Sequence, residues 1–183
     1  AERFDEMWDG VLHMVPSPGP GHQNFEGELE TWLRTFWAKP RRNRVFHNVN
    51  VGVEGTPSQN YRIPDLALLT PQSRATLQGL FFAGPPEVVV EIESPHDETR
   101  EKMSFYAGLG VREMWIIGRE TWAPEVFVLR AGRYEPELPD AEGWIESRAT
   151  GVLLRGAEEN RLAVQLEGDP DSLRYLPEDP PEE

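Results

Sequence analysis

Residues 87–93, EVVVEIE, form a short apolar run that carries two acids at its end. Such a valine-rich run suits a strand in the middle of a sheet, since both of its faces must be covered by other layers. Glu91 and Glu93 are alternate residues, so their side chains are expected on one face and within reach of one site. A carboxylate at the end of a buried strand is costly unless a positive group lies nearby. The run therefore predicts a covered central sheet with an acidic site at its edge.

The patterns on either side of this run predict a mixed fold. Apolar residues of the segment 22–38 recur on one helical face, and residues 97–110 permit a second helix. Strands are predicted at 45–53, 61–69, 87–93, 113–117 and 125–129, with weaker candidates near 134, 144–148 and 152–154. From residue 22 the order is helix, three strands, helix and strand. This order predicts an α/β or α+β layer, to which an N-terminal β-hairpin turning at Asp9 and Gly10 and extra C-terminal strands are added.

Length and composition predict one domain. The chain has 183 residues, for which we expect a single domain over 1–166 and an acidic, proline-rich tail over 167–183 with little regular structure. The sequence has no cysteine, which excludes disulfides, thiolate metal sites and cysteine nucleophiles. It has no apolar run long enough to span a membrane, and its first residues lack the order of a signal peptide. A cytoplasmic protein is expected.

The distribution of charge bears on the partner. The formal net charge of −14 opposes binding to nucleic acid, although the seven acids and one arginine of the tail account for −6 of it. Lys39, Arg41, Arg42 and Arg44 form a local basic patch, which is either a nucleic-acid contact or a solvated helix end. Lys39 and Lys102 are the only lysines beside sixteen arginines, so a specific role for each is worth testing.

Three carboxylates are candidates for one metal site. Asp65 follows Pro64 and precedes an apolar strand, and Glu91 and Glu93 stand at the end of theirs. Carboxylates from adjacent strands, with no cysteine and no cluster of histidines, form the oxygen-rich site that Mg²⁺ or Mn²⁺ prefers. Lys102 shares a helical stripe with aromatic residues, so it points toward the core. It either meets these carboxylates or covers apolar surface with its methylenes while its ammonium reaches solvent.

The sequence also resembles a known family. The spacing of Pro64 and Asp65, 25 residues and then Glu91 is similar to the PD-(D/E)XK nuclease superfamily. Within it the Uma family, described as putative restriction endonucleases, resembles the chain from about residue 3 to 118. The similar segments are RFDEMWDG for RxELxDG, SPGPGHQ for SP…HQ, a PDL segment, and VEIESPHDETREKMSFYAGLGVREMWIIG for VEVxSPxxxxxDxxxKxxxYxxxGVxEYWxxD. In the superfamily motif a lysine lies two residues after the second acid, where this chain has Glu93. In the Uma branch that lysine lies on the following helix, which is the place of Lys102.

The resemblance implies a restriction endonuclease-like fold with an αβββαβ core. It also implies Mg²⁺-dependent or Mn²⁺-dependent hydrolysis of nucleic-acid phosphodiester bonds, with DNA as the expected substrate. By the same resemblance Asp65 and Glu91 hold the metal, together with the carbonyl of Ile92, and Glu93 and Lys102 act near the reactive water or phosphate. Cutting both strands would need two sites, so a homodimer is expected, with the apolar C-terminal strands as candidates for its contact.

Two alternatives stay open. His22 opens the family-like HQ pair and is a candidate nucleic-acid contact, or else a capping or surface residue. The remaining histidines, His13, His47 and His96, are interpreted as structural. A rival to the nuclease hypothesis is a nucleic-acid or protein-binding module that keeps the fold while its carboxylates are structural. The net charge favours this rival, as does Gly118, which stands where the family has an acid.

Overall fold

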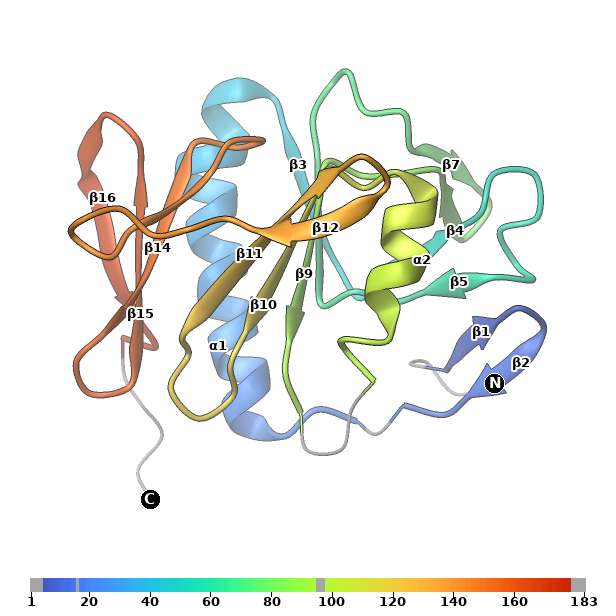
Figure 1. Cartoon of the computed structure of the whole chain (residues 1–183), viewed down its shortest axis with the longest axis horizontal. Coiled ribbons are helices and arrows are strands. Elements are labelled where there is room, and N and C mark those ends of the chain that lie inside the picture. Colours follow the sequence, from blue (N-terminus) through green and yellow to red (C-terminus); the bar gives the residue numbers. More distant parts are fainter. Residues whose placement is uncertain (1–4, 16, 95–97, 179–183) are drawn as a thin grey trace.

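The computed structural model describes residues 5–15, 17–94 and 98–178, in which two α-helices lie against three β-sheets (Figure 1). The sheets have six, six and four strands. None of the helices in these ranges is long and apolar enough to cross a membrane. The chain therefore has the mixed α+β class that the sequence predicts.

The two predicted helices are confirmed. Helix α1 (Pro20–Trp32) continues as a π-helical segment (Leu33–Ala38) and a 3₁₀ turn (Lys39–Arg41). Helix α2 (Lys102–Leu109) is shorter than the segment expected to be helical. The residue after it is Gly110, whose φ of 89° is the left-handed conformation that glycine adopts readily after the last turn of a helix.

The central sheet is built around β9. Its strand order is β12–β11–β10–β9–β6–β3, and β9 and β10 form its one parallel pair. The strands are β3 (Arg44–His47), β6 (Leu66–Leu69), β9 (Val88–Ile92), β10 (Glu113–Ile117), β11 (Pro124–Arg130) and β12 (Arg133–Pro136). Along the chain, α1 precedes β3, β6 and β9, and α2 connects β9 to the parallel β10. This is the αβββαβ order of a restriction endonuclease-like core, which confirms the predicted fold.

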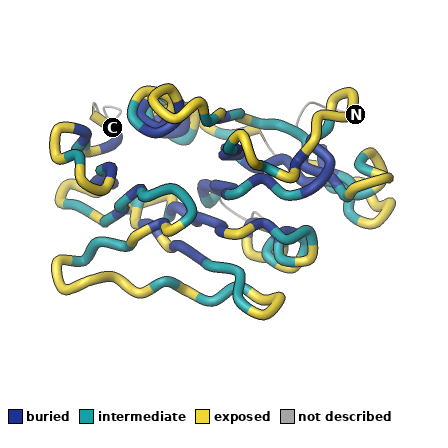
Figure 2. The backbone as a smooth tube through the Cα atoms, turned by 90° about the horizontal axis from the view of Figure 1, so that it is seen from above, coloured by how far each residue is buried: buried dark blue, intermediate teal, exposed yellow. Residues whose placement is uncertain are grey.

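Alternation along β9 explains why both faces of the central sheet are covered. Val88, Val90 and Ile92 belong to a buried cluster with α1, whereas Val89 packs in a second cluster with Tyr106 of α2. The two helices therefore lie on opposite faces of the sheet. Figure 2 shows the result, with buried backbone in the middle of the molecule and exposed backbone mainly in its outer loops. All of β9 is buried, as expected for a central strand.

The N-terminal hairpin belongs to a second sheet, of order β2–β1–β5–β4–β8–β7. Its strands are β1 (Glu6–Trp8), β2 (Val11–His13), β4 (Asn50–Gly52), β5 (Tyr61–Arg62), β7 (Thr76–Gln78) and β8 (Phe81–Ala83). Asp9 and Gly10 have φ values of 48° and 84°. A two-residue hairpin turn of the I′ type needs positive φ at both positions, so the predicted hairpin is confirmed.

The single strand predicted over 45–53 is wrong, because the segment divides between two sheets. β3 ends at His47 and β4 begins at Asn50. Between them Asn48 has a φ of 48°, and its backbone N–H donates to the carbonyl of Asp65 at 3.0 Å. The valine alternation is therefore real, but Val45 is buried in the cluster with α1 and Val51 in another cluster.

The C-terminal segment forms a third, antiparallel sheet and corrects the predicted tail. Its strands in order are β13 (Ile145–Ser147), β14 (Val152–Ala157), β15 (Arg161–Leu166) and β16 (Asp169–Leu176). The expectation that 167–183 holds little regular structure is wrong for 169–176, because β16 pairs with β15 and buries Ser172 and Leu176. Residues 179–183 of the expected tail lie outside the described ranges.

The apolar side chains of this third sheet complete the core instead of facing solvent. Val152, Leu154 and Leu162 are fully buried in the cluster that contains α1. The indole N–H of Trp32 in α1 donates to the carbonyl of Ser172 at 2.7 Å, which ties β16 to the helix. These inward side chains are used within the chain itself, so the predicted dimer contact by the C-terminal strands stays a prediction for their other face.

Candidate active site

A cavity of about 490 Å³ lies where the N-terminal hairpin, the start of α1, the start of β6, the end of β9 and α2 meet. Its wall includes the predicted site residues Asp65, Glu91, Lys102 and His22, and also Glu6 from the hairpin. Segments far apart in the sequence thus converge on one hollow, and the chemical groups in it fall into two neighbouring sets.

The first set surrounds the ammonium of Lys102. Its Nζ lies 3.0 Å from Oε2 of Glu91 and 2.9 Å from Oε1 of Glu6, and the side chains of all three residues are buried. The hydroxyl of Tyr106, one turn further along α2, donates to Oε1 of Glu91 at 2.8 Å. The prediction that Lys102 points inward is confirmed, and its ammonium meets carboxylates instead of reaching solvent.

Burial and charge act together on the ionisation of this set. Burial alone would lower the pKa of Lys102, but the carboxylates of Glu91 and Glu6 raise it above its ordinary value. Burial raises the pKa of the Glu91 carboxyl, and the Lys102 ammonium opposes that rise. Burial, then the charges of Glu91 and Glu6, raise the pKa of the Tyr106 hydroxyl well above its ordinary value. At neutral pH the set therefore presents a charged ammonium and a neutral phenol donor.

The second set is centred on Asp65, which precedes the first residue of β6. Pro64 lies between β5 and β6, at the strand boundary that its missing N–H favours. β6 and β9 are antiparallel neighbours, and Oδ2 of Asp65 accepts the backbone N–H of Ile92 at 2.6 Å. This bond fixes the carboxylate beside the end of β9, where Glu91 also reaches the cavity.

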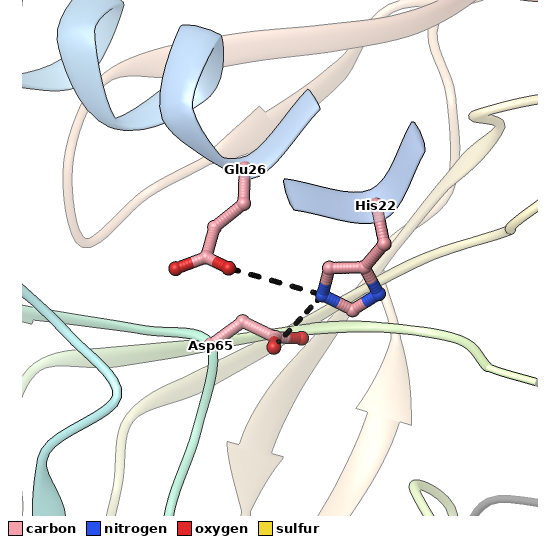
Figure 3. Close-up of side chains that lie close together, drawn as sticks. All are labelled: His22, Glu26 and Asp65. Atoms are coloured by element: carbon pink, nitrogen blue, oxygen red, sulfur yellow. Dashed lines mark hydrogen bonds and ion pairs between the residues drawn. The ribbon is translucent and has the colours of Figure 1, made fainter. Parts of the chain in front are cut away.

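His22 and Glu26 approach Asp65 from α1. They are four residues apart and so share one face of the helix. Nε2 of His22 lies 3.0 Å from Oδ1 of Asp65 and 3.9 Å from Oε2 of Glu26 (Figure 3). One ligand atom from each residue falls within 4.8 Å of those of the other two, which is close enough to hold one metal ion. Burial and the nearby Asp65 raise the pKa of Glu26 to about 7, with His22 opposing the shift.

Comparison with known proteins gives the family and the fold of the chain. Residues 2–156 match the model of the Uma2 family, described as "Putative restriction endonuclease". The chain belongs to the Uma2 family. A crystal structure of "a putative nuclease belonging to DUF820" from Anabaena variabilis ATCC 29413 is similar, with a TM-score of 0.58 and 20% identity over 75% of this chain and 78% of that chain. At this identity the likeness shows the fold. No curated protein matches the sequence.

Some predicted residues of this Uma2 protein lie away from the cavity. The carboxylate of Glu93 is paired with Arg100 at 3.1 Å, is one-third exposed and does not belong to the cavity wall. Of the two carboxylates on either side of Ile92, that of Glu91 enters the cavity and that of Glu93 reaches the surface.

The basic patch is also remote from the cavity. Lys39, Arg41, Arg42 and Arg44 are exposed. Arg44 pairs across the sheet with Leu69, which is four residues along β6 from Asp65 and so about 13 Å away. The patch and the cavity therefore lie toward opposite ends of the same strands.

Two buried acids of the cavity region, Glu6 and Glu26, are missing from the sequence-based prediction. Glu6 occupies the acid position of the RFDEMWDG segment, and Glu26 is the one acid four residues from His22 on α1. The motif and the helical spacing are the signals that could have indicated them. The sequence pattern does not show that folding brings the hairpin and α1 to the start of β6 and the end of β9.

Proposed function

We propose that the chain is a divalent-metal-dependent phosphodiesterase that cleaves nucleic acid, with DNA as the substrate to test first. The observation that carries this proposal is the placement of a buried, charged Lys102 beside Glu91 and Asp65 in a single cavity. The family match supports nuclease activity. The metal, the substrate and the residue roles are inferred from the chemistry of the cavity.

The donors of the cavity fit a divalent ion. Asp65 and Glu91 of the wall, and Glu26 beside Asp65, offer carboxylate oxygens, the ligands that Mg²⁺ and Mn²⁺ take most readily. The oxygens of Glu91 accept bonds from Lys102 and Tyr106, but a carboxylate has about four lone-pair positions, so coordination by Glu91 remains open. Asp65 and Glu91 stay the proposed first ligands, although Glu91 lies outside the group of His22, Glu26 and Asp65 whose ligand atoms fall within 4.8 Å of one another. A divalent ion supplies Lewis acidity toward a phosphate oxygen and lowers the pKa of water.

Lys102 is proposed to stabilise the charge that develops on the phosphate. Its ammonium has three N–H donors, of which two reach Glu91 and Glu6 among the described residues. A third donor remains for a phosphate oxygen. Because the two carboxylates and α2 hold the ammonium in place, little reorganisation is needed when charge develops. Glu93 is left out of this proposal, because its carboxylate pairs with Arg100 outside the cavity.

The negative charge of the cavity wall is a reason to expect that binding of nucleic acid depends on a metal ion. Among the described residues, the wall of the cavity carries Glu6, Asp65, Glu91 and Glu98 against the single ammonium of Lys102. A phosphodiester entering the metal-free cavity would therefore meet net negative charge. We expect binding of nucleic acid at this site to require a divalent ion.

The basic patch is proposed as a second, independent contact for the nucleic acid. Replacing Arg41, Arg42 and Arg44 by alanine should weaken binding and reduce its dependence on salt, because each phosphate contact contributes about one unit of slope on duplex DNA. An unchanged slope would assign the patch to solvation. A homodimer remains the proposed assembly for cutting both strands, and analytical ultracentrifugation would test it.

One structural observation favours the rival, a binding module without catalysis. The contacts among Lys102, Glu91, Glu6 and Tyr106 are also those of a structural ion network. Incubating the protein with plasmid, linear DNA and RNA in Mg²⁺, Mn²⁺ or EDTA separates the hypotheses. Cleavage that needs the metal and is lost in Asp65→Asn supports the nuclease. Binding without any cleavage supports the module.

A further inference from the structure

We propose that His22 and Glu26 complete the cation site at Asp65, and that the His22 imidazole makes it select first-row transition-metal ions such as Mn²⁺ over Mg²⁺. This inference adds to the proposed function. Its part that concerns cleavage rests on that function. It names two additional ligands and the class of ion. The sequence analysis assigns His22 other roles, as a nucleic-acid contact or as a capping or surface residue.

The spacing of the three groups is that of ligands around one ion. Two atoms that each lie about 2.1 Å from an ion are about 3.0 Å apart at right angles and about 4.2 Å apart on opposite sides. Nε2 of His22 is 3.0 Å from Asp65 and 3.9 Å from Glu26, so both pairs fall in this range. In Figure 3 the three side chains point toward one another, two from α1 and one from the start of β6.

The environment of Glu26 calls for a cation. Its side chain is only 7% exposed and lies beside the second carboxylate, Asp65. Oε1 receives a long bond of 3.4 Å from Asn48 and lies 3.6 Å from Nδ1 of the half-exposed His47. Oε2 faces His22 at 3.9 Å, beyond hydrogen-bond distance. A buried carboxylate oxygen directed into a space shared with another acid is expensive without a positive partner. An ion between these oxygens would supply that partner.

The ring of His22 is oriented to offer Nε2. Its other nitrogen, Nδ1, lies 3.4 Å from the hydroxyl of Ser94, just after β9. A ligating histidine characteristically uses its second nitrogen to bond a neighbouring group, which fixes the tautomer and the orientation of the ring. The ring is also only 10% exposed, so it is held in place on both sides.

The donor set indicates the class of ion. Carboxylates alone suit Mg²⁺, Ca²⁺ and Mn²⁺, whereas imidazole nitrogen favours first-row transition metals. Mg²⁺ also gives up its water reluctantly and is usually held by one or two carboxylates instead of a larger protein cage. A set of two carboxylates and one imidazole that is largely buried therefore favours Mn²⁺ over Mg²⁺.

The test uses Mn²⁺ as the probe of the full chain. Pulsed electron paramagnetic resonance of the Mn²⁺-loaded protein should show modulation from a directly bound ¹⁴N nucleus, which should change on labelling with ¹⁵N-histidine. His22→Gln puts an amide oxygen near the place of Nε2. It should abolish the nitrogen signal and weaken Mn²⁺ binding by about tenfold or more, while Mg²⁺ binding, measured by calorimetry, changes much less.

His47→Asn is the matched control. His47 also lies beside Glu26, with Nδ1 3.6 Å from Oε1, but it is half exposed and outside the three-residue group. This variant should keep the nitrogen signal and the preference for Mn²⁺. Because the isotope label is read in the wild type, the assignment does not depend on how well the variants fold.

The outcomes separate this inference from the proposed function. Absence of Mn²⁺ binding, bound Mn²⁺ without a nitrogen signal, or a signal that survives His22→Gln overturns the inference whatever the cleavage result. A nitrogen signal that depends on His22, in a protein that cleaves neither DNA nor RNA, overturns the proposed nuclease and supports the metal site. A signal and cleavage that are both lost in His22→Gln support both.

Discussion

The ammonium nitrogen of Lys102 lies 2.9 Å from Oε1 of Glu6, so α2 and the N-terminal hairpin are joined inside the protein by an ion pair. Glu6 is only 1% exposed and is itself held, since it also accepts the backbone N–H of Ile63 and the indole N–H of Trp8, both at 2.8 Å. The hairpin therefore fixes the position of the proposed catalytic lysine, although it lies some ninety residues earlier in the chain.

The first prediction concerns this pair. Glu6→Gln keeps the acceptor for Ile63 but removes the charge opposite Lys102, which retains Glu91. We expect the free energy of unfolding to fall by about 1–3 kcal/mol, as for loss of a hydrogen bond to a buried charged group. Urea denaturation at pH 7 measures it. Glu135→Gln, which breaks only exposed contacts with Arg130 and Arg133, should change stability by less than about 0.5 kcal/mol.

The second prediction concerns Lys102 itself. Lys102→Met keeps much of the apolar stem but leaves Glu6 and Glu91 buried without their cation, so a loss of about 3–5 kcal/mol in stability is expected. Adding Glu6→Gln removes one of the unpaired charges and should recover part of that loss. Cleavage by the double variant should stay lower than that of Glu6→Gln by about 10² or more, because the pre-organised ammonium is gone. Equal cleavage by the two variants would exclude a catalytic role for Lys102.

Part of this site could be predicted because the responsible patterns are local. The burial of β9 follows from its valines, and the inward direction of Lys102 follows from its helical stripe with Tyr106. A carboxylate that ends such a strand needs a positive neighbour, and a rare lysine on the next helix is the nearest candidate. These steps require only strand alternation, helical spacing and the cost of buried charge.

The remaining features depend on tertiary contacts that a local pattern does not contain. Valine alternation over 45–53 is the same for one strand or for two, and the break comes from the bond between Asn48 and the carbonyl of Asp65. Likewise, Glu93 has the same alternation as Glu91, but β9 ends at Ile92 and Arg100 captures the second carboxylate. Glu26 joins the site because α1 begins beside β6, a placement that only the folded chain defines.

The third prediction concerns the pH dependence of stability without metal. Burial and Asp65 raise the pKa of Glu26 from 4.5 to about 7, so the folded state binds this proton more tightly than the unfolded state. Above about pH 7 such a carboxyl reduces the free energy of unfolding by its full amount. This reduction disappears as the pH falls from about 7 to about 4.5. In EDTA, Glu26→Gln should therefore raise the melting temperature at pH 8, with a difference from wild type that shrinks by pH 5.

Glu54→Gln provides the control for this titration, because Glu54 is exposed in the loop after β4. Its melting temperature should follow that of the wild type across the same pH range. A stabilisation by Glu26→Gln that is equal at pH 5 and pH 8 would contradict the assigned pKa. Saturating Mn²⁺ should reverse the order of wild type and Glu26→Gln at pH 8, since only the wild type keeps the full ligand set, and a ligand bound to the folded state stabilises it.

The last prediction concerns β16, whose acids and prolines suggested an irregular tail. The residues of β16 that face inward are buried in the core. The carbonyl of Ser172 accepts the indole N–H of Trp32, and the hydroxyl of Ser172 accepts the backbone N–H of Leu166. Leu176 is only 2% exposed. Ending the chain at Gly168 should therefore remove part of the core and abolish cooperative unfolding, whereas ending it after Glu178 removes none of these contacts. Because the shorter chain is expected not to fold, Leu176→Ala gives the quantitative test. It should cost about 2–5 kcal/mol in urea denaturation, against less than about 0.5 kcal/mol for Leu138→Ala, whose side chain is 78% exposed. Equal effects of the two leucine substitutions would show that β16 is not part of the core in solution.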